Sequence, residues 1–123
     1  MENGASQRRE LERAVVVDCR ACRTLCEDTL EQLLTAGAAP REDPLVRSLM
    51  SCAAVAETTA AWLDEDRRLA ASLLEFCAES CEGAAQQLEA VSKDGKLSEC
   101  ARTCRATADS VRALLWNDYE ASS

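Results

Sequence analysis

The chain has 123 residues, a formal net charge of −8 at neutral pH and no histidine. Such an acidic chain lacks the basic patches with which proteins bind phosphates, so nucleic acid is excluded as the expected partner. Ala, Leu, Glu and Arg are abundant, whereas aromatic residues make up only 3% of the chain, and this composition predicts an all-α protein.

Signals at helix ends divide the sequence into four helices within a single domain, residues 1–123. The first helix is expected to follow a disordered lead, with Ser6 as its cap and Gly37 at its end. Asp43 followed by Pro44 predicts a capped start for the second helix. The expected ranges are about 6–36, 44–63, 66–92 and 97–117.

An acidic cluster, residues 64–66, marks the boundary between the second and third helices, and we expect it to cap the third helix. A frayed tail is expected from Glu120 onward. Four helices of similar length with short connections favour an antiparallel four-helix bundle with up-down-up-down topology.

Two kinds of targeting segment are not visible in the sequence. No apolar run approaches the roughly 18 residues of a membrane span, and the charged N-terminus has no apolar signal core. We therefore expect a cytoplasmic protein without membrane contact.

The sequence also lacks the usual residues of an active site. No histidine or glycine-rich phosphate loop is present, and the carboxylates are scattered over outward faces, so no enzymatic activity is expected.

All eight cysteines lie on one apolar stripe that follows the four helices. Within each helix the stripe residues alternate between spacings of three and four, which is the period that faces a bundle core. The thiols are therefore expected to point inward. They are Cys19, Cys22, Cys26, Cys52, Cys77, Cys81, Cys100 and Cys104.

This pattern of thiols favours a soft metal ion, with all eight cysteines as candidate ligands. Cysteines four residues apart on a helix bring their side chains within about 6 Å of each other. Thiolates select Cu(I), Zn(II) or iron–sulfur clusters. Iron–sulfur clusters usually hang on loops, and the lack of histidine removes a common ligand for Zn(II). We therefore expect Cu(I).

Four segments of the chain carry a resemblance to a known family. They are Cys19-x-x-Cys22-x-x-x-Cys26 and the stretches 49–53, 74–82 and 100–105. Together they resemble the cysteine-rich four-helix-bundle copper storage proteins. The resemblance implies Cu(I) held by core cysteines, a homo-oligomer (dimer or tetramer) and a cytosolic location.

The chain is poorer in thiols than is typical of that family. Family members typically continue the ladder of cysteines further along the core and carry His or Met near one mouth of the bundle. At about two thiolates per Cu(I), eight thiols would hold on the order of four ions. The chain has other residues at the corresponding positions, namely Thr29, Leu33, Ala56, Thr59, Ala84, Leu88, Thr107 and Val111.

A second interpretation is a structural or interaction bundle that has lost metal storage. The motifs Cys77-x-x-x-Cys81 and Cys100-x-x-x-Cys104 would then close two disulfides or one Zn(II) site between adjacent helices. The expected turn position places the two motifs roughly 12 Å apart along the helix axis. Disulfides need Cα atoms within about 7 Å, so this register disfavours them.

Overall fold

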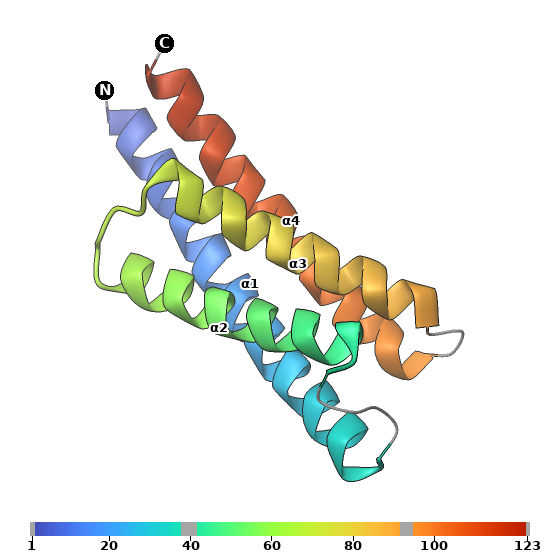
Figure 1. Ribbon diagram of the computed structural model, residues 1–123. Helices are drawn as coiled ribbons and strands as arrows, with labels where there is room; N and C mark the ends of the chain where they lie inside the picture. The colour runs from blue at the N-terminus through green and yellow to red at the C-terminus, as the bar shows by residue number, and fades with distance from the viewer. Residues whose placement is uncertain (1, 38–41, 92–94, 123) are drawn as a thin grey trace.

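The computed structural model describes residues 2–37, 42–91 and 95–122, and these form four α-helices. Each helix packs against its two neighbours in the ring α1–α2–α3–α4. Successive helices run in opposite directions (Figure 1). The predicted all-α antiparallel four-helix bundle is confirmed. The helices are α1 (Glu2–Thr35), α2 (Pro44–Asp64), α3 (Ala71–Val91) and α4 (Gly95–Ser122).

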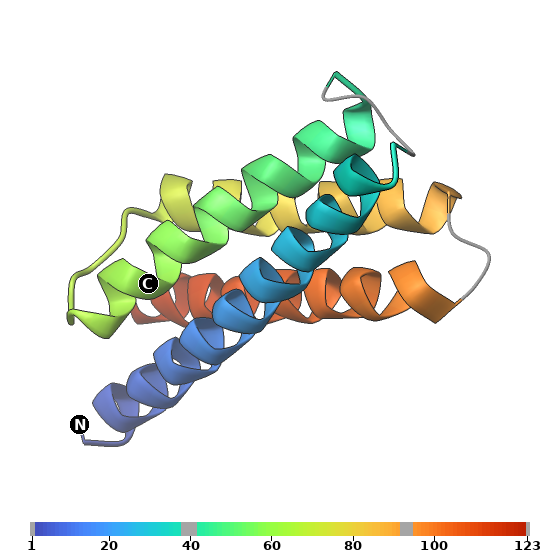
Figure 2. The same ribbon diagram turned by 90° about the horizontal axis from the view of Figure 1, so that it is seen from below.

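Different helix starts and ends lie at the two ends of the bundle. The end of α2, the start of α3 and both chain ends lie together (Figures 1 and 2). At the opposite end, which we call the α4-start end, α1 and α3 finish and α2 and α4 begin.

Among the described residues, no helix combines the length and apolar character that membrane crossing requires.

The outer turns of α1 and α4 hold each other in place. The guanidinium of Arg8 donates to the Asp118 carboxylate at 2.9 and 3.0 Å. Tyr119 Oη donates to Glu75 of α3 at 2.6 Å. The contacts stabilise the neighbouring turns of these helices. Residues 2–5 and 120–122 are helical, so the predicted disordered lead, the cap at Ser6 and the frayed tail are wrong there. Met1 and Ser123 lie outside the described residues.

The acidic cluster at 64–66 ends α2 and does not cap α3, so the predicted start of α3 at residue 66 is wrong. Asp66 adopts a left-handed conformation with φ of 59°, which Asp tolerates better than most residues. The amide of Arg67 then donates to Trp62 O at 3.0 Å, which closes the end of the helix. Leu69 is buried in the connection, and α3 begins only at Ala71.

Other predicted helix signals are confirmed. The Asp43 carboxylate accepts the amide hydrogen of Leu45 at 2.8 Å, and Pro44 is the first residue of α2. Gly37 has a φ of 65° just after α1, where a residue without Cβ relieves backbone strain. α4 begins at Gly95, two residues before the predicted start.

The core consists of the predicted stripe, with exceptions at its ends. Buried leucines and valines lie on both sides of a central section of cysteines. Ala70 and Val91 continue the three-and-four spacing at the two ends of α3, but both are exposed because they lie at or beyond the ends of the helix. Thr107 is fully buried, and its hydroxyl donates a hydrogen bond to the backbone oxygen of Asp18 in α1 at 3.0 Å. The buried hydroxyl therefore has a hydrogen-bond partner inside the core.

Replacement of Asp43 by Ala should lower the free energy of unfolding by about 1 kcal/mol, because the amide at the start of α2 loses its acceptor. Urea denaturation followed by circular dichroism would measure this loss. Glu42→Ala is the matched control, since it removes the neighbouring exposed carboxylate without touching the cap. Equal destabilisation by the two substitutions would contradict the capping role of Asp43.

Candidate metal centre

Eight free thiols fill the middle of the core, and each has 1% or less of its surface exposed. Three come from α1, one from α2, two from α3 and two from α4. The stripe period therefore predicted their inward orientation correctly. All eight belong to one continuous cluster of buried residues.

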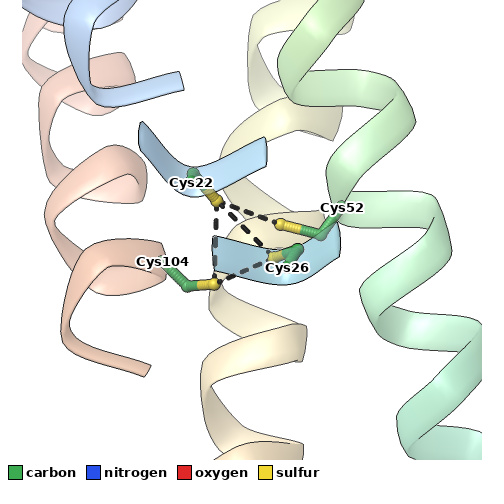
Figure 3. A group of neighbouring side chains, drawn as sticks. All are labelled: Cys22, Cys26, Cys52 and Cys104. Carbon is green, nitrogen blue, oxygen red and sulfur yellow. Dashed lines mark hydrogen bonds between the residues drawn. The ribbon is translucent and has the colours of Figure 1, made fainter. Parts of the chain in front are cut away.

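Four of these thiols converge on one point and form what we call the quartet: Cys22, Cys26, Cys52 and Cys104. Their Sγ atoms all lie within 4.8 Å of one another. Cys22 Sγ is 3.4 Å from Cys52, 3.7 Å from Cys104 and 4.0 Å from Cys26. Cys26 Sγ is also 3.7 Å from Cys104. Figure 3 shows these side chains pointing toward each other from α1, α2 and α4.

The other four cysteines extend the quartet into a column. Cys100 Sγ lies 3.9 Å from Cys26, toward the α4-start end. Cys81 Sγ lies 3.6 Å from Cys52, on the other side of the quartet. Beyond it lie Cys77 of α3 and Cys19 of α1, and each is the main cause of the other's pKa shift. Every predicted ligand is therefore part of the column.

The register between α1 and α4 brings the column together. Arg8 lies opposite Asp118, and the pairs Cys22–Cys104 and Cys26–Cys100 continue the same antiparallel register. Each step along α1 is matched by an equal step back along α4. The spacing of four within each motif therefore places two thiols of α1 against two thiols of α4.

Hydrogen bonds between thiols shift their pKa values in both directions. Bonds from Cys19 and Cys81 lower the pKa of Cys77, and bonds from Cys104 and Cys26 lower the pKa of Cys100. The pKa of Cys104 is raised, first by its hydrogen bond with Cys100. In each case the first cause is a neighbouring thiol, so the protonation of one cysteine depends on that of the next.

The alternative in which the two Cys-x-x-x-Cys motifs of α3 and α4 face each other is wrong. Residues 75, 82 and 89 of α3 pair with residues 119, 112 and 105 of α4. In this register Cys77 lies level with residue 117, roughly 20 Å along the axis from Cys104 at 1.5 Å per residue. The α3 thiols instead meet those of α1 and α2.

A surface pocket reaches the column at Cys100. It has a volume of about 700 Å³ and lies beside Gly95, where α4 starts. Cys100 contributes to its wall, and Thr29 lies beside that thiol. The side chains that line it are Leu25, Asp28, Thr29, Gln32, Glu99 and Cys100, with Gly95 at its edge.

Sequence reasoning missed the two carboxylates of this pocket, Asp28 and Glu99. Each lies directly beside a residue of the stripe, Thr29 or Cys100. A position next to the stripe indicates a carboxylate at the edge of the core. Only the α1–α4 register, however, shows that the two carboxylates lie at the same pocket. The outward faces of helices carry many other carboxylates, so position along the chain did not distinguish these two.

The donor set of the column is purely sulfur, because no carboxylate belongs to the quartet and the chain has no histidine. Such a set favours soft d¹⁰ ions over hard cations such as Mg²⁺ or Ca²⁺. Four sulfurs at these spacings surround a position at which one ion, or a small cluster, would contact several thiolates at once. The arrangement is therefore suited to hold metal ions away from water.

Comparison with known proteins gives an independent result. The model of a protein family described as copper storage protein matches residues 8–116, which include every cysteine, all of α2 and α3 and most of α1 and α4. Neither the search of curated proteins nor that of solved structures found a match. A match over so much of the chain is decisive for membership, so this cysteine-lined bundle belongs to the copper storage protein family.

Proposed function

We propose that the protein binds and buffers Cu(I) through the thiolates of its core, with all eight cysteines as ligands. The observation that carries this proposal is the quartet, in which four sulfurs from three helices converge without any nitrogen or oxygen ligand. Membership of the copper storage family supports copper as the cargo. Sulfur ligation and burial favour the monovalent ion, which is soft and weakly hydrated.

In the proposed mechanism, Cu(I) arrives on a weaker ligand and is transferred to thiolates by ligand exchange. Each cysteine that binds must release its proton, so uptake is coupled to proton release. The buried core then separates the ion from water and from oxidants, since every thiol is 1% or less exposed. At about two thiolates per ion, the column would hold on the order of four Cu(I) ions.

Location and assembly follow from the same chemistry. Eight free thiols remain reduced in a reducing compartment, which supports a cytoplasmic location. Leu73 and Phe76 of α3 are each about half exposed and line an apolar pocket between α2 and α3. This apolar surface supports self-association as a dimer or tetramer. The function is storage without catalysis.

The pocket beside Cys100 serves in this proposal as the access route for Cu(I). The thiol of Cys100 is part of the lining of this pocket. Asp28 and Glu99 place negative charge at its rim, where it raises the local concentration of cations. An ion that reaches Cys100 would pass next to Cys26, 3.9 Å away, and so enter the quartet.

Replacement of both Cys77 and Cys81 by Ser should reduce the number of Cu(I) ions bound per chain, because the end of the column away from the pocket loses its sulfurs. Anaerobic titration of the reduced protein against a chromogenic Cu(I) chelator would measure this capacity. Ala84→Ser is the control, since it adds a buried hydroxyl to α3 without removing a thiol. Unchanged capacity in the double variant would show that these two cysteines are not ligands.

Replacement of Asp28 by Asn together with Glu99 by Gln should slow Cu(I) uptake several-fold at low ionic strength and leave the capacity unchanged. Stopped-flow transfer from a Cu(I) chelator would measure the rate, and added salt should reduce the difference by screening. The matched control is Glu10→Gln with Glu79→Gln, which removes two exposed carboxylates elsewhere. Equal rates for the two double variants would contradict this access route.

A further inference from the structure

The quartet has the dimensions of a single four-coordinate site. Zn(II) in structural sites is tetrahedral, with Zn–S distances of about 2.3 Å, which places the sulfurs about 3.8 Å from one another. In the quartet the four hydrogen-bonded Sγ pairs are 3.4, 3.7, 3.7 and 4.0 Å apart. The other two Sγ pairs are also within 4.8 Å, so shifts of up to about 1 Å would complete a tetrahedron.

The helices that supply the ligands also supply the right geometry. Cys22 and Cys26 lie one turn apart on α1 and provide one edge of the tetrahedron. Cys52 of α2 and Cys104 of α4 approach this edge from opposite sides, as Figure 3 shows. Because all four positions lie within helices packed in one core, the site is largely formed before any ion arrives.

Charge is the main obstacle to a divalent ion here, and neighbouring thiols offset it. When Zn(II) replaces four thiol protons, the four thiolates and the ion together carry a charge of −2, which is costly in an apolar core. Cys81 lies 3.6 Å from Cys52, and Cys100 lies 3.9 Å from Cys26. Both sulfurs lie within hydrogen-bond reach of a ligand sulfur, so polarisable thiols and not only hydrocarbon would surround this charge.

We propose that the quartet is also a binding site for one Zn(II) ion per chain, with the sulfurs of Cys81 and Cys100 packed around it. This set of ligands differs from the hairpin set of Cys77, Cys81, Cys100 and Cys104 that the sequence motifs suggested, because it draws on α1, α2 and α4. Zn(II) would occupy the site when Cu(I) is scarce. Cu(I) would then displace it, with release of the zinc ion.

Co(II) is the probe that tests this site, because its absorption spectrum reports tetrahedral geometry and sulfur ligation directly. The full-length reduced protein is titrated with Co(II) under anaerobic conditions. We expect saturation at one ion per chain, with the intense visible bands of a tetrahedral site and charge-transfer bands of four thiolates. One equivalent of Zn(II) should then bleach this spectrum.

Two variants separate the quartet from the rest of the column. Cys26→Ser should abolish the tetrathiolate spectrum, whereas Cys19→Ser, which is equally buried but outside the quartet, should preserve it. Circular dichroism of each variant checks that the bundle is folded. Equal loss in both variants, or wild-type protein with only octahedral Co(II) bands or no saturable uptake, would overturn the proposal.

The Zn(II) proposal and the Cu(I) proposal can be tested independently of each other. The same wild-type sample is titrated with Cu(I) against a chelator in parallel. Cu(I) uptake without a tetrahedral Co(II) spectrum would refute the zinc site and leave the copper proposal intact. A tetrahedral Co(II) spectrum without competitive Cu(I) uptake would support the zinc site and refute the copper proposal.

Discussion

The antiparallel register between α1 and α4 is the constraint on which the metal centre depends. It is fixed outside the column by the ion pair of Arg8 with Asp118 and inside the core by the Thr107 hydroxyl on Asp18 O. A slip of one turn would move α4 by about 5.4 Å. Cys104 would then no longer face Cys22, and the quartet would be lost even though every cysteine stayed inside the core. These polar contacts thus stabilise the observed register over a shifted register that would bury the same apolar faces.

The bundle does not need a metal ion in order to have a core. Leucines and valines pack at both ends of the column, for example Val15, Leu49, Leu74, Leu88 and Leu114, all fully buried. Cysteine itself packs as a small apolar residue while it is protonated. Small zinc domains, in contrast, fold only when the metal binds. Here the ligands are already positioned, so little conformational entropy is lost on binding, and more of the metal–sulfur energy appears as affinity.

The sequence predicted the parts of this structure that local periodicity controls. The helices, the buried face and the inward orientation of all eight cysteines follow from a spacing of three and four residues. The partners of each thiol could not be read in the same way, because they depend on the register between helices. The paired motifs of α3 and α4 looked like a hairpin site, yet ion pairs such as Glu89–Arg105 fix a register that separates them. The start of α3 was missed because Asp66 adopts a left-handed conformation that Gly adopts more often.

The charge of the core, more than the geometry of its sulfurs, decides between the ions that the column can hold. Four converging thiols suit both a monovalent and a divalent d¹⁰ ion. A Cu(I) ion with two thiolates would carry a charge of −1, whereas a Zn(II) ion with four thiolates would carry −2, so burial in an apolar core would penalise the copper site less. In the same buried core, charge would therefore favour Cu(I) even at a position where the sulfur geometry suits both ions.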